Sequence, residues 1–158
     1  MQIAKQLYTI GYEGQTLESF LSRLLSIGID TLVDVRELPL SRKRGFSKNA
    51  LARALDSNGI EYVHIPELGC PKRVRDLYKI NGNWSEYLSS FNAHLLQQEE
   101  ALMSLAEFSR RKSAALMCFE ANFMRCHRTI VARAAAKAAS TELLHITQET
   151  IVPDSAHP

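Results

Sequence analysis

The stretch AALMCFEANFMRCHRTIVARAAAKAAS, residues 114–140, decides the fold. It begins with an apolar run of the length of a buried strand and passes through a short polar loop into an alanine-rich helical segment. A strand that leads through a loop into a helix is the repeating unit of a parallel sheet covered by helices. We therefore expect the rest of the chain to repeat this unit.

Four other apolar runs have the length of buried strands, and these are residues 6–10, 31–35, 61–65 and 143–146. Apolar residues with helical spacing lie between a Thr16 cap and a Gly28 stop, which predicts a helix over about 17–27. Ser47 and Gly59 are residue types that begin and end a second helix.

The longest helical pattern begins at Asn83, which has the spacing of a capping box with Glu86. The pattern continues toward Leu105, and we expect a break near Gln98. Residues 66–82 contain two prolines and two glycines, which predicts a loop with one short helix.

These patterns predict an α/β fold, namely a single three-layer (αβα) Rossmann-like domain over residues 1–147. Alternating strands and helices predict a mainly parallel, five-stranded sheet. Residues 148–158 end in PDSAHP, which is typical of a flexible C-terminal tail. The length of 158 residues is that of one domain.

The composition is that of a soluble globular protein, with 46% hydrophobic and 23% charged residues. We expect no membrane segment, since no run approaches the ~18 apolar residues that a spanning helix needs. Three cysteines, an odd number, favour the cytoplasm and reduced thiols. A net charge of +2 does not by itself indicate nucleic acid binding, so basic patches such as SRKR at 41–44 must be considered locally. The sequence indicates no cofactor and leaves the oligomeric state open.

The residues able to do chemistry gather in four loops. In parallel sheets, ligands bind beyond the carboxyl ends of the strands. The strand-end loops are GYEG (11–14), DVRELPLSRKRGF (34–46), HIPELGC (64–70) and CFEANFMRCHR (118–128). All three cysteines lie in them. We therefore expect one pocket at this edge of the sheet, lined among others by Asp34, Arg36, Glu120 and Arg128.

The last of these loops leads into a helix whose first turn is predicted to contain Arg125, Cys126, His127 and Arg128. Cations are unfavourable at the positive end of the helix dipole, so a negative group is expected to complete the site. The dipole and the flanking cations favour the thiolate of Cys126. The same N–H and guanidinium groups are also suited to bind phosphate. The two interpretations compete for one pocket.

Three other interpretations are weaker. Gly11 and Gly14 permit backbone approach to a phosphate, but their spacing favours a tight turn. The SRKR loop could contact a phosphate backbone, with Phe46 available to stack on a base. Cys118 and the adjacent Cys126–His127 pair lack the tight ligand spacing of structural zinc sites, so no metal is predicted.

Four motifs in this order resemble the domain of unknown function 488 family of small bacterial and archaeal proteins: TIGYEGQTLESF, LVDVRELPLSR, EYVHIPELG, and LMCFE followed by CHR. The resemblance covers about residues 7–140. It implies site positions, and no reaction, at Gly11, Tyr12, Gly14, Asp34, Arg36, Ser41, Arg42, Glu67, Cys118, Glu120, Cys126, His127 and Arg128. The chain departs from the family pattern at Cys70, where glycine is usual.

The function we expect is that of an enzyme acting on an anionic, phosphate-bearing substrate such as a nucleotide or nucleic acid. Arg36, Arg128 and the helix start would hold the anion. Glu120 or Asp34 would be the general acid or base, with His127 as the alternative.

Cys118 or Cys126 would be the nucleophile of such an enzyme. One alternative is a non-catalytic nucleic-acid-binding module. Another is a redox or sulfur-transfer protein in which the two cysteines form a disulfide. LVDVRE is also similar to a strand of rhodanese-type sulfurtransferases, but the interval from Cys118 to Arg128 is too long for their catalytic loop.

Overall fold

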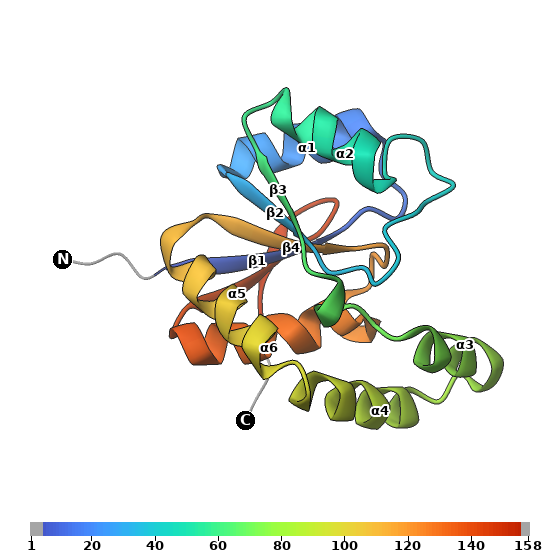
Figure 1. The fold of residues 1–158 in the computed structure, drawn as a ribbon. Coiled ribbons are helices and arrows are strands. Elements are labelled where there is room, and N and C mark those ends of the chain that lie inside the picture. Colours follow the sequence, from blue (N-terminus) through green and yellow to red (C-terminus); the bar gives the residue numbers. More distant parts are fainter. Residues whose placement is uncertain (1–4, 156–158) are drawn as a thin grey trace.

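The computed structural model describes residues 5–155, which form a six-stranded sheet with helices on both faces (Figure 1). The strands are β1 (Gln6–Gly11), β2 (Thr31–Asp34), β3 (Glu61–His64), β4 (Ala114–Cys118), β5 (Glu142–Ile146) and β6 (Ile151–Pro153). Their order across the sheet is β3-β2-β4-β1-β5-β6. The first five strands are parallel, and β6 pairs with β5 in the antiparallel sense. The predicted three-layer α/β fold is confirmed.

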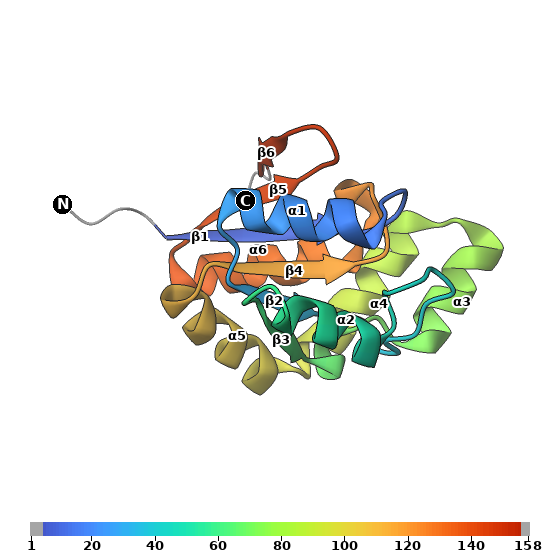
Figure 2. The ribbon, with the colours of Figure 1, turned by 90° about the horizontal axis from the view of Figure 1, so that it is seen from above.

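Helices cover the sheet in two layers and extend beyond it (Figures 1 and 2). One face is covered by α1 (Leu17–Ile27) and α2 (Lys48–Asp56), and the other by α5 (Glu99–Arg111) and α6 (His127–Ala139). α3 (Lys72–Asn81) and α4 (Trp84–Leu96) project past the carboxyl edge of the sheet. No helix within residues 5–155 is long and apolar enough to span a membrane.

The core has one hydrophobic cluster on each side of the sheet, because successive strand residues point to opposite faces. On β1, Leu7 packs toward α5 and α6, whereas Tyr8 and Ile10 pack toward α1 and α2. The first helix has the predicted limits: the Thr16 hydroxyl accepts a hydrogen bond from the Ser19 N–H, and Gly28 ends the helix.

The prediction of five strands and a tail from residue 148 was wrong, because Ile151–Pro153 form β6 at the sheet edge. Asp154 then forms an ion pair with Arg133 at 3.0 Å and accepts a hydrogen bond from His145 Nε2 at 2.8 Å. Three residues ending in proline give no strand periodicity, and proline is tolerated on an edge strand. Residues 156–158 of the predicted tail lie outside the described residues.

The helical content of residues 66–82 was underestimated. This segment contains a short 3₁₀ turn, Pro66–Leu68, and the ten-residue helix α3. Pro71 lies just before α3, and Gly82 follows it in the left-handed conformation with φ 62°. Proline and glycine therefore flank the helix instead of interrupting it, as is usual at helix ends.

Gly11 allows the loops after β1 and β4 to run in contact. A Cβ atom at Gly11 would overlap the carbonyl oxygen of Glu120. The two loops are also joined by a hydrogen bond from the Glu13 N–H to the Phe119 carbonyl, at 2.8 Å. Gly14 has φ +79° and turns the chain, as its sequence context favoured. The close approach at Gly11 therefore positions the residues that follow Cys118.

Gly11→Ala should lower the free energy of unfolding by at least about 2 kcal/mol, because the added methyl group would overlap the backbone carbonyl of Glu120. Gly59→Ala is the control: Gly59 has φ +73°, and a Cβ there meets nothing within 4 Å. It should cost only about 1 kcal/mol, from the left-handed conformation. Urea unfolding measures both variants, and equal losses would contradict the close approach.

Candidate functional site

A cavity of about 500 Å³ opens at the carboxyl edge of the sheet. Its lining comes from the loops after β1, β2 and β4, from the start of α6, and from α3 and α4. The predicted site residues that line it are Tyr12, Arg36, Ser41, Arg42, Cys118, Glu120, Cys126 and His127. The sequence therefore identified the correct edge of the sheet and much of one cavity.

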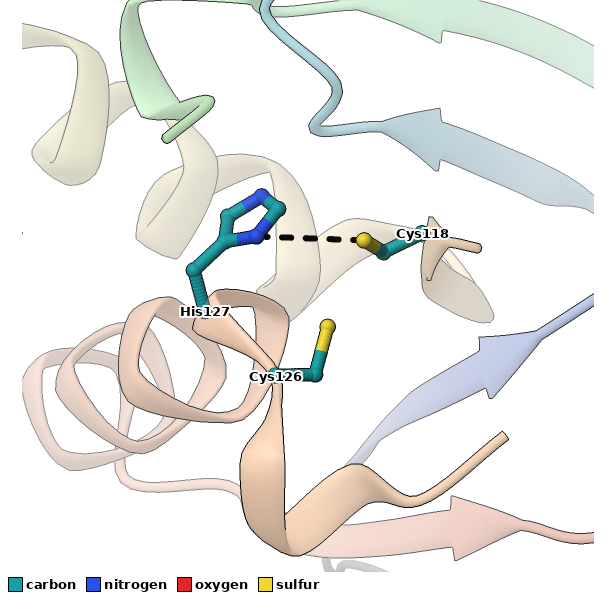
Figure 3. Close-up of side chains that lie close together, drawn as sticks. All are labelled: Cys118, Cys126 and His127. Carbon is teal, nitrogen blue, oxygen red and sulfur yellow. Dashed lines mark hydrogen bonds between the residues drawn. The ribbon is translucent and has the colours of Figure 1, made fainter. Parts of the chain in front are cut away.

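Two sulfur atoms and an imidazole meet in this cavity (Figure 3). Cys118 ends β4, Cys126 immediately precedes α6, and His127 is the first residue of that helix. Their Sγ, Sγ and ring nitrogen atoms all lie within 4.8 Å of one another, and all three residues are buried. The helix thus begins one residue after Cys126, which had been expected inside its first turn.

The orientation of the His127 ring follows from one hydrogen bond. Nε2 lies 2.6 Å from the carbonyl oxygen of Val35, and a carbonyl can only accept, so Nε2 bears the proton. In the neutral ring, Nδ1 therefore has a free lone pair. Nδ1 lies 3.8 Å from Cys118 Sγ (Figure 3). The imidazole thus presents a base, or a ligand atom, to the sulfur atoms.

The two cysteines have opposite pKa shifts. Burial tends to raise the pKa of Cys126, but the hydrogen bond from Cys118 and the positive charge of Arg128 hold this pKa well below its usual value. The hydrogen bond to Cys126, together with burial, raises the pKa of Cys118 well above its usual value. Of the two thiols, that of Cys126 is consequently the one that loses its proton more readily.

Asp34 and Arg36 form a buried ion pair at the end of β2. Arg36 Nε and Nη2 donate to the two carboxylate oxygens of Asp34 at 2.9 and 2.8 Å. The Tyr62 hydroxyl donates to the same carboxylate at 2.6 Å. Asp34 has no exposed surface and does not line the cavity, whereas Arg36 does and donates to the Tyr12 hydroxyl at 3.2 Å. Asp34 therefore orients the Arg36 side chain and balances its charge.

Arg128 lies behind the cavity and not in it. Its side chain is fully buried, and Nη1 donates to the Glu120 carbonyl at 2.5 Å. The expectation that Asp34, Arg36, Glu120 and Arg128 all line one pocket was thus wrong for Asp34 and Arg128. Successive residues of a helix point about 100° apart, so His127 can face the cavity while Arg128 faces the interior.

Glu120 lines the cavity and is exposed to solvent. Partial desolvation raises the pKa of its carboxyl group, and the nearby Cys126 and Glu13 raise it further, against the opposing charge of Arg128. Glu120 is therefore suited to keep a proton at a higher pH than an exposed glutamate.

The cavity has an excess of positive charge. Besides Arg36, it is lined by Arg42, Arg75, Lys79 and Arg125. Arg75 is paired with Glu37 at 2.9 Å. Within residues 5–155, no carboxylate lies within ion-pair distance of Arg42, Lys79 or Arg125. These three cations are available for an anion.

The remaining predicted residues lie outside the cavity. Gly11 is the last residue of β1, and Gly14 lies in the turn that follows. Glu67 is exposed, and its carbonyl accepts a hydrogen bond from His94. Phe46 is fully buried and stacked on Tyr12, with ring centroids 4.4 Å apart. The expectation that Phe46 could stack on a base was therefore wrong.

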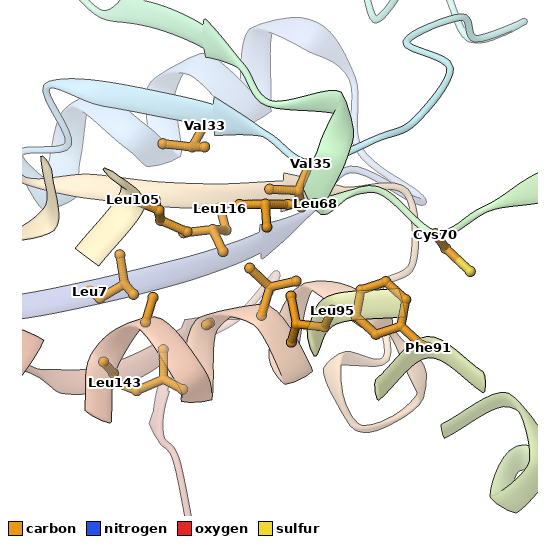
Figure 4. Close-up of a cluster of buried hydrophobic side chains, with 14 of the residues drawn as sticks. Leu7, Val33, Val35, Leu68, Cys70, Phe91, Leu95, Leu105, Leu116 and Leu143 are labelled. Carbon is orange, nitrogen blue, oxygen red and sulfur yellow. The ribbon is translucent and has the colours of Figure 1, made fainter. Parts of the chain in front are cut away.

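The sequence did not identify the wall that α3 and α4 supply. The missed lining residues include Cys70, Arg75, Tyr78, Lys79 and Tyr87. Cys70 lies at the end of the hydrophobic cluster on the α4–α6 side of the sheet, and burial raises its pKa to about 11 (Figure 4). A signal was present, because Cys70 departs from the family pattern and a basic segment follows it.

A mainly parallel α/β domain with a cysteine–histidine cluster in the lining of a cationic cavity is the class that this structure defines. The chain belongs to the family described as domain of unknown function DUF488, whose model matches residues 16–135. The resemblance in the motifs is thereby confirmed. A comparison with curated proteins finds no match.

Replacing Asp34 alone should lower the free energy of unfolding far more than replacing both Asp34 and Arg36. Asp34→Asn leaves the Arg36 charge buried without its counter-charge, which should cost at least about 3 kcal/mol of unfolding free energy. Asp34→Leu combined with Arg36→Met removes both charges and should cost much less. Urea unfolding of both variants provides the comparison. A loss below about 1 kcal/mol for Asp34→Asn would contradict this role of the pair.

Proposed function

We propose that the protein is an enzyme that acts on an anionic, phosphate-bearing substrate, such as a nucleotide or the end of a nucleic acid. The observation that supports this proposal is the combination, in one cavity, of unpaired cations with a cysteine–histidine cluster. A non-catalytic surface would require only the cations. We also propose the cytoplasm as its location, because three free cysteines fit a reducing compartment.

Arg42, Lys79 and Arg125 would bind the anion through charge-assisted hydrogen bonds. The guanidinium of Arg125 lies 5.3 Å from the ring centre of Trp84, which restrains it beside the cavity. A volume of about 500 Å³ lies within the range typical of small-molecule sites. The cavity therefore suits a substrate of nucleotide size better than a flat contact with a long polymer.

Glu120 and the cluster of Cys118, Cys126 and His127 would supply the chemistry. A carboxyl group with a raised pKa is suited to donate a proton to a leaving group. A thiolate is both a strong nucleophile and a metal ligand, so the cluster brings reactive groups to the cavity in either role.

The rival interpretation as a nucleic-acid-binding module has less support. Of the basic SRKR segment, Ser41 and Arg42 line the cavity, and the neighbouring Phe46 is buried. The segment is therefore part of a concave site and offers no aromatic platform for bases. This interpretation also leaves the cysteine–histidine cluster without a role.

Inorganic phosphate should stabilise the folded protein through the cavity. At ten times its dissociation constant, phosphate should add about 1.4 kcal/mol to the free energy of unfolding. Arg42→Gln combined with Arg125→Gln should remove this gain, measured as a shift of the thermal midpoint. Arg53→Gln, an exposed substitution on α2, is the control and also corrects for general salt effects. An undiminished response of the double variant would contradict the anion site.

Turnover should depend on the groups inside the cavity. With 4-nitrophenyl phosphate and nucleoside monophosphates as probes, Glu120→Gln and Cys126→Ser should each lower kcat at least about 100-fold. Both variants should keep the phosphate-induced stabilisation, and Arg53→Gln should keep both properties. Phosphate binding without turnover in the wild type would instead support a binding module.

A further inference from the structure

We propose that Cys118, Cys126 and His127 form a zinc site whose fourth coordination position faces the cavity. Tetrahedral zinc with bonds of about 2.3 Å to sulfur and 2.0 Å to nitrogen places a sulfur and a nitrogen ligand about 3.5 Å apart. Cys118 Sγ and His127 Nδ1 are 3.8 Å apart, and all three ligand atoms lie within 4.8 Å of one another. Zinc binding therefore requires the Cys118 sulfur and the His127 nitrogen to move only a few tenths of an ångström closer together.

The imidazole is already held in the form that binds a metal. Ligating histidines usually donate their other ring N–H to a carboxylate or a backbone carbonyl, which fixes the tautomer and the ring orientation. His127 Nε2 makes this bond to the Val35 carbonyl at 2.6 Å. Nδ1 is left to point at the sulfur atoms (Figure 3).

The charges of the cluster also match zinc. Cysteines bound to zinc are thiolates, and two thiolates with a neutral imidazole neutralise a divalent cation, so the occupied site carries no net charge next to the buried guanidinium of Arg128. Soft thiolate ligands favour zinc over magnesium or calcium, which prefer oxygen. A hard divalent cation is therefore not expected to occupy this site.

The fourth position opens onto the proposed substrate site. Within residues 5–155 no fourth cysteine, histidine or carboxylate joins the group, and its three members all line the cavity. Three protein ligands with one open position are the arrangement of zinc sites that do chemistry. Such an ion can polarise a phosphoryl oxygen or lower the pKa of a bound water. That catalytic role depends on the proposed function, but the metal site itself does not.

The spacing of the proposed ligands in the sequence does not indicate a metal site, because they do not come from one tight ligand loop. Cys118 is at the end of β4, and the Cys126–His127 pair is at the start of α6. The 3₁₀ turn Phe123–Arg125 connects them. The fold, and not the local spacing, brings the three ligands together.

Cobalt(II) is the probe for this site, because it replaces zinc and reports its ligands by absorption. The reduced, metal-free full-length protein should bind about one Co(II) per chain, with intense sulfur-to-metal charge-transfer absorption and the visible bands of tetrahedral geometry, and Zn²⁺ should abolish both. Cys126→Ser and His127→Gln should weaken binding at least about 100-fold, more than the 10- to 100-fold loss typical of removing a hydrogen-bond partner of a ligand.

Cys70→Ser is the matched control, because Cys70 is a buried cysteine that lines the same cavity but is not one of the three ligands. It should bind Co(II) as the wild type does. Absence of the charge-transfer band in the wild type, or an equal loss in Cys70→Ser and Cys126→Ser, would overturn the proposal.

A second measurement needs no variant that might fail to fold. Zn²⁺ should slow alkylation of Cys118 and Cys126 in the native wild type, read by mass spectrometry, and leave the rate at Cys70 unchanged. Equal protection of all three cysteines, or none, would contradict the site. The shift of the thermal midpoint by phosphate, measured on the metal-free protein, tests the proposed function separately. A failure of the metal site can therefore be distinguished from a failure of the proposed function.

Discussion

The hydrogen bond from His127 Nε2 to the Val35 carbonyl is the constraint on which the site depends. It joins the start of α6 to the end of β2, and it lies in a buried region where hydrogen bonds are strong. Without it, either ring nitrogen could hold the proton, and the ring could turn away from Cys118. With it, the ring nitrogen that faces the sulfur atoms has the free lone pair of the neutral ring. A backbone carbonyl therefore determines what the imidazole can do.

Some of the charges around the cavity are paired within the protein, and others have no carboxylate partner among residues 5–155. Arg36 is balanced by Asp34, and Arg128 stabilises the Cys126 thiolate from the interior side. Arg42 and Arg125 face the opening without a carboxylate partner among the described residues. Buried cations need partners, because an isolated charge in the interior is costly, whereas cations at an opening stay hydrated until a ligand arrives. The paired cations therefore support the structure of the site, and the unpaired cations are the ones available to bind a ligand.

Periodicity was enough to predict the five parallel strands and the three layers, because these strands are apolar runs and α1 has clear capping residues at Thr16 and Gly28. The convergence of the strand-end loops followed from the parallel sheet alone. The parallel sheet does not predict which way each side chain points, since His127 and Arg128 are neighbours that face different sides. The contribution of α3 to the cavity was also not predicted, because the departure at Cys70 and the basic segment after it do not by themselves show where this helix lies relative to the sheet.

The short strand β6 has a consequence for how copies of the protein meet. Strand β5 would otherwise present a row of unpaired backbone N–H and C=O groups, a template onto which a strand of another molecule could add. β6 occupies this row, and the contact of Asp154 with Arg133 fastens it in place. Pro153 in turn has no N–H to offer a further strand. The edge that remains on this side of the sheet is therefore a strand of only three residues that ends in proline, which offers little backbone for a further strand to pair with.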